Sequence, residues 1–155
     1  MTKNKIKVLY VDDEENNLFS FKAAFRLNYQ IYTAISGEKA IQILNENPDI
    51  QIILTDQRMP EMTGVEFLKS ILPIHPDPIR ILLTGYADLK ASIDAVNEGK
   101  IFHYLSKPWN EEEIEMTLQK AYQLYMQAQN EKEMKNKLIQ TADQMEFLLR
   151  QSLLS

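Results

Sequence analysis

Polar side chains that could do chemistry follow four separate apolar runs of the sequence. Asp12 and Asp13 come directly after the first run, and the later runs are followed by Asp56, Thr84 and Lys107. If these runs are parallel strands of one sheet, their carboxyl ends lie at the same edge, where ligands of such sheets bind. Three carboxylates, one hydroxyl and one ammonium would then share a small space.

Neighbouring carboxylates repel one another unless one is protonated or a cation lies among them. Mg²⁺ prefers oxygen ligands and is usually held by one or two carboxylates together with water and phosphate oxygens. Asp56 is the candidate nucleophile, because a carboxylate can accept a phosphoryl group to form an aspartyl-phosphate. Lys107 and Thr84 would then contact phosphoryl oxygens, which supplies the positioning and charge stabilisation that phosphoryl transfer needs. For Asp12 and Asp13 a simpler alternative is the N-cap of a following helix.

The elements that must position these residues alternate from the start of the chain to about residue 110. Amphipathic segments at 16–27, 36–47, 65–71 and 89–96 predict four helices; Ser36 is a candidate N-cap and Gly99 ends the fourth. Between them, apolar runs predict five strands, at Ile6–Val11, Tyr29–Ala34, Ile50–Thr55, Arg80–Thr84 and Ile101–Leu105. This alternation predicts an α/β fold with a parallel sheet covered on both faces and right-handed crossovers. The pattern alone does not determine the strand order.

The last part of the chain has a different character. Residues 111–155 contain neither glycine nor proline and are dominated by strong helix formers. Their first apolar stripe could lie on the sheet: Ile114, Leu118, Ala121, Tyr125 and Ala128. A second stripe follows in a shifted phase: Met134, Leu138, Thr141, Met145 and Leu148. The pattern fits one long helix, or a helix whose second half forms a short coiled coil with another chain. We therefore divide the chain into a domain, 1–128, and a helical extension, 129–155.

Composition and charge exclude several classes of protein. The net charge of −5 gives no electrostatic footprint for nucleic acid or an anionic membrane. The absence of cysteine excludes disulfides and thiolate chemistry, and the two histidines, His75 and His103, lie too far apart in sequence to suggest a metal site. No segment resembles a signal peptide or a membrane span. These observations predict a cytoplasmic protein.

Four motifs in order carry a resemblance to a known family: VDDE at 11–14, LTDQRMPEMTGVEFL at 54–68, ILLTGYAD at 81–88 and YLSKPW at 104–109. From about Lys5 to Ala128 the chain resembles the CheY-like receiver domain of response regulators in two-component signalling. The resemblance implies a flavodoxin-like, doubly wound (βα)5 fold with strand order 2-1-3-4-5, to which the long C-terminal helix is added.

The resemblance also implies a role for each site residue. Asp56 matches the phosphoacceptor and Lys107 the family's lysine, with a cis bond between Lys107 and Pro108. Thr84 matches the switch hydroxyl and Tyr104 the switch aromatic. Mg²⁺ would be held by Asp13 and Asp56, by Asp12 directly or through water, and by the backbone carbonyl of Arg58.

By resemblance, the partner is a histidine kinase or a phosphotransfer protein. The chain would catalyse only its own phosphorylation and dephosphorylation, so we do not expect an enzyme in the ordinary sense. The phosphoryl group would alter the face made by the fourth helix, the fifth strand and the fifth helix. Because no output domain is visible, the final helix is either a signalling helix cut from a longer chain or the dimerisation arm of a short protein. We expect a homodimer through this helix.

Other classes of protein fit less well. A phosphohydrolase of the haloacid-dehalogenase type needs a second aspartate two residues after the nucleophile, where this chain has Arg58. A flavodoxin would have a Ser/Thr/Gly-rich phosphate loop after the first strand, where DDEENN would repel phosphate. A DNA-binding regulator would have a basic recognition helix, which the near-neutral tail lacks. A stand-alone protein-binding adaptor with the same fold remains an alternative.

Overall fold

The computed structural model describes residues 4–85 and 100–154. Its centre is a five-stranded sheet in the order β2-β1-β3-β4-β5, and all the strand pairs are parallel. The strands are β1 (Ile6–Val11), β2 (Tyr29–Ala34), β3 (Ile52–Asp56), β4 (Ile79–Thr84) and β5 (His103–Ser106). The flavodoxin-like fold and its strand order are thus confirmed, while the helix expected at 89–96 lies outside the described residues.

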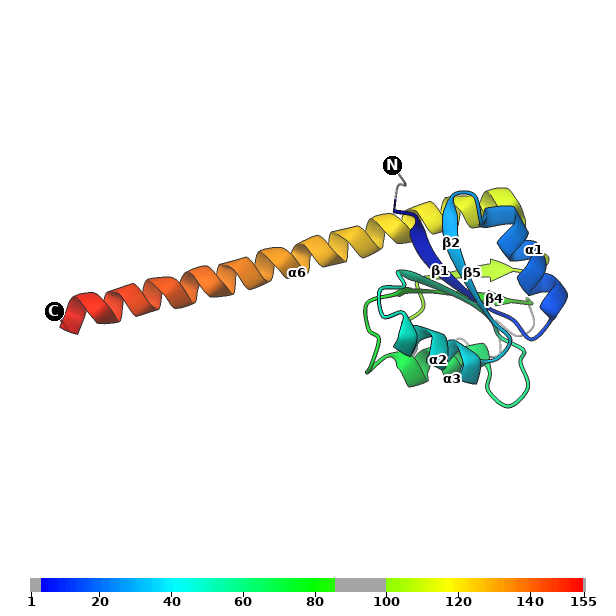
Figure 1. Ribbon diagram of the computed structural model, residues 1–155, viewed down its shortest axis with the longest axis horizontal. Helices are drawn as coiled ribbons and strands as arrows, with labels where there is room; N and C mark the ends of the chain where they lie inside the picture. Colours follow the sequence, from blue (N-terminus) through cyan, green and yellow to red (C-terminus); the bar gives the residue numbers. More distant parts are fainter. Residues whose placement is uncertain (1–3, 86–99, 155) are drawn as a thin grey trace.

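Helices cover both faces of the sheet (Figure 1). The described helices are α1 (Glu15–Phe25), α2 (Gly37–Glu46), α3 (Gly64–Ile71) and α6 (Glu111–Leu154). The expected N-cap at Ser36 is confirmed, since its side chain accepts a hydrogen bond from the backbone N–H of Lys39. Thr63 caps α3 in the same way, through the N–H of Glu66. None of the described helices is long and apolar enough to cross a membrane.

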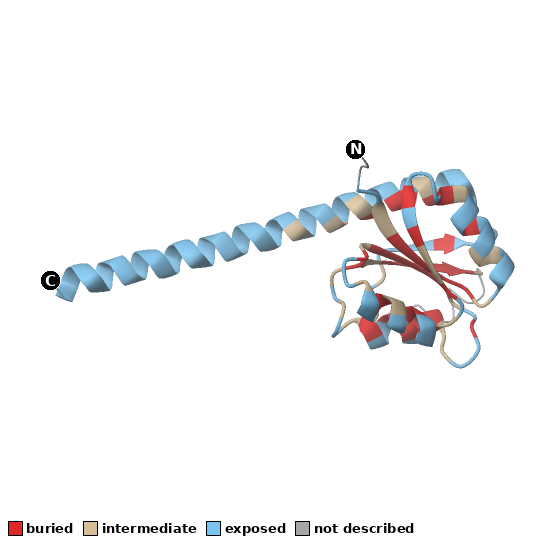
Figure 2. Ribbon diagram, viewed as in Figure 1, coloured by how far each residue is buried: buried red, intermediate tan, exposed pale blue. Residues whose placement is uncertain are grey.

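The two faces of the sheet carry separate apolar cores, because side chains alternate along each strand. On β1, Val8 and Tyr10 pack with α1 and the start of α6, whereas Leu9 and Val11 pack with α2 and α3. Figure 2 shows the buried residues concentrated on the central strands and on the helix faces that meet them. The strands are therefore rigidly held between two layers, and this fixes where their carboxyl ends lie.

Two predicted strands begin later than expected. Ile50 is buried but precedes β3, its N–H donating to the carbonyl of Asn47, and β3 extends one residue further than predicted to include Asp56. Ile101 likewise precedes β5, which begins at His103. Apolar runs mark burial rather than strand pairing, so the predicted boundaries were shifted by two residues at the amino ends.

The long helix α6 has a buried first part and an exposed remainder. Ile114, Leu118 and Ala121 are fully buried in the core shared with α1, as predicted. The prediction is wrong for Ala128, which is exposed: Tyr125 and Gln129 are still half-buried, so the side of α6 that faces the domain passes through Gln129 rather than Ala128. Further along, the helix extends away from the sheet (Figure 1). The second predicted stripe is exposed along its whole length.

Polar contacts hold α6 against the domain. The hydroxyl of Tyr29 donates to Glu115 (2.9 Å) and accepts from Gln119 (2.7 Å). Further along the helix, Lys132 forms an ion pair with Asp77 in the loop before β4. In addition to its buried apolar side chains, α6 is thus joined to the described part of the domain by polar contacts near Tyr29 and near Asp77, and its residues beyond Lys132 are exposed.

Candidate functional site

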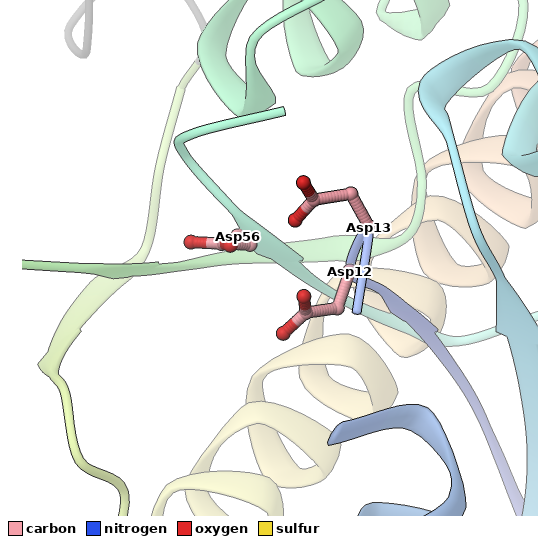
Figure 3. A group of neighbouring side chains, drawn as sticks. All are labelled: Asp12, Asp13 and Asp56. Carbon is pink, nitrogen blue, oxygen red and sulfur yellow. The ribbon is translucent and has the colours of Figure 1, made fainter. Parts of the chain in front are cut away.

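Three carboxylates meet at the carboxyl ends of β1 and β3, which are neighbours in the sheet. Asp12 and Asp13 follow β1, and Asp56 is the last residue of β3. One oxygen from each carboxylate lies within 4.8 Å of the others, as Figure 3 illustrates. The structure therefore brings together the three aspartates that the sequence selected, although they come from segments more than forty residues apart.

Asp12 is fully buried and held by three donors. Its Oδ2 accepts hydrogen bonds from the hydroxyl of Tyr10 (2.7 Å) and from Nδ2 of Asn17 (3.1 Å). Its Oδ1 accepts from the backbone N–H of Glu14 (3.0 Å). The N-cap alternative for Asp12 and Asp13 is wrong, because the N-cap residue of α1 is Glu14, whose own side chain makes no capping hydrogen bond.

Lys107 supplies the positive charge of the site. Its Nζ lies 2.8 Å from Oδ2 of Asp56 and 3.8 Å from Oδ2 of Asp12. The expected cis bond between Lys107 and Pro108 is present. The backbone N–H of Lys107 also donates to the carbonyl of Thr84 (3.3 Å), which ties the loop after β5 to the end of β4. The ammonium is therefore held beside the carboxylate expected to react.

Burial and charge shift the ionisation of this pair. Burial raises the pKa of Asp56, and the charge of Asp12 adds to this, although the hydrogen bond and charge of Lys107 work in the opposite direction. Burial alone would lower the pKa of Lys107, but its hydrogen bond to Asp56 and the charges of Asp56, Asp12 and Glu14 raise it overall. Without a further cation, the carboxylates thus carry more negative charge than Lys107 neutralises.

The other predicted site residues lie at different distances from this centre. Thr84 ends β4 one residue after Leu83, the register partner of Asp56; its side chain is buried, and its hydroxyl donates to the carbonyl of Gly85 (3.3 Å). Arg58 lies in the exposed loop that follows β3. Tyr104 lies on the edge strand β5 with 36% of its surface exposed. The ring of Tyr104 therefore does not point into the core in this structure.

Sequence reasoning missed two kinds of supporting residue. A Cβ on Gly64 would lie 2.3 Å from the carbonyl oxygen of Asp56, so only glycine permits this close approach of α3 to the end of β3. The signal was available, because Thr63 and Glu66 flank Gly64 with capping-box spacing, which places a helix start there.

The hydrogen bonds of Tyr10 and Asn17 to Asp12 had no such signal, since a tyrosine in an apolar run is usually a packing residue.

The donor set fits a hard divalent cation. All three side chains offer carboxylate oxygens, the ligands that Mg²⁺ prefers. The carboxylate of Asp13 is partly exposed and has no hydrogen-bond or ion-pair partner in the described part of the chain. An acidic pocket with one unpartnered carboxylate is the arrangement that a bound cation would stabilise.

Comparison with known proteins identifies the family. Residues 8–119 match the family described as the response regulator receiver domain. The chain is 34% identical over 118 residues to the hydrogenase transcriptional regulatory protein HoxA of Bradyrhizobium diazoefficiens, and 33% identical over 120 residues to the regulatory protein AtoC of Escherichia coli. Each alignment covers 76% of this chain but only 24% and 25%, respectively, of the relative. The chain therefore spans about a quarter of the length of these curated relatives.

Solved structures agree with this assignment. A structure described as an adenylate cyclase from Rhodopirellula baltica has a TM-score of 0.81 at 28% identity, covering 86% of this chain and 98% of that one. A response regulator receiver domain protein from Clostridium thermocellum has a TM-score of 0.69 at 33% identity, covering 74% and 92%. The fold, the acidic pocket beside Lys107 and the matched residues together place this chain in the response regulator receiver domain family.

Proposed function

We propose that this chain is a phosphoacceptor switch in which Asp56 receives a phosphoryl group from a histidine kinase or a phosphotransfer protein. The observation that carries the proposal is the contact between Asp56 and Lys107 inside a group of three carboxylates. The pair places a nucleophilic oxygen and a positive charge at one point of the sheet edge. Receiver domains signal rather than turn over a substrate, and we extend this to a chain whose only chemistry is its own phosphorylation and dephosphorylation.

The proposed phosphoryl transfer uses three side chains of this chain: Asp56, Lys107 and Thr84. An oxygen of Asp56 forms a bond to phosphorus while the bond from phosphorus to the donor's histidine nitrogen breaks, and that nitrogen keeps the electron pair. Lys107 exchanges its contact with the Asp56 carboxylate for a contact with a phosphoryl oxygen. The hydroxyl of Thr84 turns from the carbonyl of Gly85 to donate to another phosphoryl oxygen. Later, water attacks phosphorus, which releases inorganic phosphate and restores Asp56.

Mg²⁺ is the cation that we assign to the acidic pocket. Asp13 and Asp56 would hold it, with Asp12 acting directly or through water and with the backbone carbonyl of Arg58. When bound, the ion neutralises charge on the carboxylates and the phosphoryl oxygens. Asp12 is best placed to act through water, because protein donors already engage both of its oxygens.

The switch is proposed to run from Thr84 to Tyr104. Movement of the Thr84 hydroxyl toward the phosphoryl group would make room beside β5, and the ring of Tyr104, now partly exposed, would turn inward. Such a rearrangement changes the face that contains β5 and the start of α6. One added charge can bias a two-state surface in this way.

The helical extension, 129–155, is proposed to pair with a second copy of the chain, apart from the receiver domain at 1–128. Beyond Lys132, α6 has no ion pair or apolar contact with the described part of the domain, and a helix that stands alone in water is marginal. Pairing would bury its exposed stripe: Met134, Leu138, Thr141, Met145 and Leu148. An output domain beyond this helix is in keeping with the greater length of the curated relatives, and we expect the chain to act in the cytoplasm.

The phosphohydrolase alternative is not favoured. It requires a general acid two residues after the nucleophile, and Arg58 occupies that position. A stand-alone adaptor would use the same surface without phosphorylation, so it predicts that removal of the Asp56 carboxylate leaves partner binding unchanged. The adaptor also predicts no phosphoryl adduct on Asp56, so the test of the proposed function distinguishes it from a phosphoacceptor, while Arg58 argues against the phosphohydrolase.

The function is tested by treating the chain with acetyl phosphate and Mg²⁺ and measuring the intact mass. The wild type should gain one phosphoryl group that hydroxylamine removes, and peptide mapping should place it on Asp56. Asp56→Asn should gain none, whereas Asp49→Asn, a control at an exposed ion pair with Lys7, should react like the wild type. A wild type that gains no adduct, or an Asp56→Asn protein that gains it equally, would show that the proposal is wrong.

A further inference from the structure

A tyrosine hydroxyl reaches the site from inside the core. Tyr10 is fully buried on β1, on the face covered by α1 and α6. Residues two apart on a strand share a face, and the Tyr10 hydroxyl donates to Oδ2 of Asp12 at 2.7 Å. A carboxylate oxygen can only accept a hydrogen bond, so the phenolic hydroxyl is the donor in this contact.

The bonded oxygen is also the one that faces the lysine. Oδ2 of Asp12 lies 3.8 Å from Nζ of Lys107, while Oδ2 of Asp56 lies 2.8 Å from the same nitrogen. Asp12 and Asp56 are thus two possible partners for one ammonium. The hydroxyl of Tyr10 and the amide of Asn17 satisfy Oδ2 of Asp12, which leaves the shorter contact of Lys107 to Asp56.

The ring of Tyr10 is itself anchored in an aromatic cluster. It stacks on Phe21 with ring centroids 4.3 Å apart, and Phe21 contacts Trp109 edge-on at 5.9 Å. Trp109 follows Lys107 by two residues. The same cluster therefore holds both the donor to Asp12 and the chain segment that carries Lys107.

We infer that Tyr10 is a positioning residue of the phosphorylation site, whose hydroxyl holds Asp12 away from Lys107 and thereby reserves the ammonium for Asp56. This inference rests on the proposed function and adds a residue to it. A phenylalanine at this position would pack as well as tyrosine, but it would leave Oδ2 of Asp12 short of a donor. A buried carboxylate that loses a donor is stabilised by another donor or by a cation, and the ammonium of Lys107 already lies 3.8 Å from Oδ2 of Asp12. Asp12 and Asp56 would then share Lys107, and the geometry around Asp13 would change.

The test compares Tyr10→Phe with the wild type and with Tyr29→Phe. Tyr29 is a matched control because it is buried in the same core, and its hydroxyl also donates to a carboxylate, Glu115 on α6. Mg²⁺ affinity is measured by calorimetry, phosphorylation by the rate of adduct formation with acetyl phosphate, and folding by thermal unfolding without metal. Far-UV circular dichroism of the metal-free protein reports whether the secondary structure is intact.

For Tyr10→Phe we expect the Mg²⁺ dissociation constant to rise about tenfold and the phosphorylation rate to fall by a similar factor, as for other supports of metal ligands. The far-UV circular dichroism spectrum of the metal-free protein should be unchanged. For Tyr29→Phe we expect both site measurements to stay within about twofold of the wild type, even if thermal stability falls.

Three results would overturn the inference and leave the proposed function standing: equal Mg²⁺ affinity in Tyr10→Phe and the wild type, equal losses in both variants, or a Tyr10→Phe protein that does not fold. The last would mean that the core, rather than the site, needs the hydroxyl. A wild type that gains no adduct at Asp56 is a different outcome, because it removes the proposed function and the inference together.

Discussion

The edge of the sheet at Asp56 and the outer half of α6 are incomplete in opposite ways. At the sheet edge, buried carboxylates exceed the positive charge that Lys107 supplies. Along the outer half of α6, large apolar side chains such as Leu138 and Met145 are mostly exposed, because no described part of the domain packs against them. One region lacks a cation and the other lacks an apolar partner.

Each region indicates the kind of partner that it binds. Excess buried charge is relieved by small ions and phosphoryl groups, which fit a rigid edge where strand ends are fixed. Exposed apolar surface is buried when another protein surface packs against it. On a single helix such apolar surface forms a stripe along one side. The four experiments below test this division, beginning with the largest expected effect.

Replacement of Lys107 should have the largest effect. Lys107→Met keeps an unbranched chain but removes the charge beside Asp56, so we expect phosphorylation by acetyl phosphate to slow by roughly 10²–10³-fold, the usual cost of losing one charge-stabilising donor. The measurement is the initial rate of adduct formation. The control is Lys132→Met on α6, far along the chain from the site. A rate within threefold of the wild type would contradict the role assigned to Lys107.

Removal of residues 129–155 should convert a dimer into a monomer, measured by light scattering. A sharper version uses two neighbours on α6. Leu138→Glu places a charge on the exposed stripe and should abolish the dimer, whereas Ile139→Glu lies beside the stripe and should leave it intact. If the wild type is a monomer, or if both variants behave alike, the stripe is not the dimer contact.

Gly64→Ala should destabilise the support of the site. The added Cβ would meet the carbonyl oxygen of Asp56 at 2.3 Å, and backbone cannot yield as a side chain can. We expect the free energy of unfolding in urea to fall by about 1–3 kcal/mol, as for other overpacked sites. Gly37→Ala is the control, because its nearest contact is the flexible side chain of Met62. Equal stabilities for the two variants would show that α3 and β3 separate easily.

Asp56→Asn should have the smallest effect, on stability in the absence of metal. Burial raises the pKa of Asp56 above its ordinary value, so the charged form is disfavoured in the folded state. Protonated Asp56 therefore stabilises the folded state relative to the unfolded state. This stabilisation is complete below the pKa of Asp56 in the unfolded chain, and it is lost as the pH rises through the higher pKa in the folded chain. At pH 7 we expect Asp56→Asn to unfold a few degrees above the wild type, with no difference below about pH 4.

Asp49→Asn is the control for the direction of the stability change expected in Asp56→Asn. Asp49 is exposed, and its hydrogen bond with Lys7 lowers its pKa, which is the opposite shift. Its contribution is present above its ordinary pKa and is lost as the pH falls, so Asp49→Asn should not raise stability at pH 7. A thermal unfolding series from pH 3 to 8 in EDTA measures both variants. An Asp56→Asn protein less stable than the wild type at pH 7 would mean that Lys107 outweighs burial.

Much of the fold could be read from local patterns. The five strands follow from apolar runs, and the start of α2 follows from Ser36. The errors have local causes too. Ile50 is buried without being in a strand, because an apolar residue in the preceding turn also packs on the core. Ala128 continues the stripe of α6 in sequence but is exposed, because steps of four and three do not follow the domain-facing side of the helix closely, and Gln129 is half-buried there instead.

The amino-acid sequence was enough to identify the residue types that could form the site: carboxylates, a hydroxyl and an ammonium, each at the end of an apolar run. It did not show which of these side chains contact one another in the folded chain. Lys107 contacts Asp56 across 51 positions of the chain, and Tyr10 satisfies Asp12 from within the core. The physical reason is that periodicity reports the environment of one segment, whereas a contact depends on which strands lie side by side and how their side chains pack. In this chain the strand order β2-β1-β3-β4-β5 places the ends of β1 and β3 side by side, and so brings Asp12 and Asp56 together.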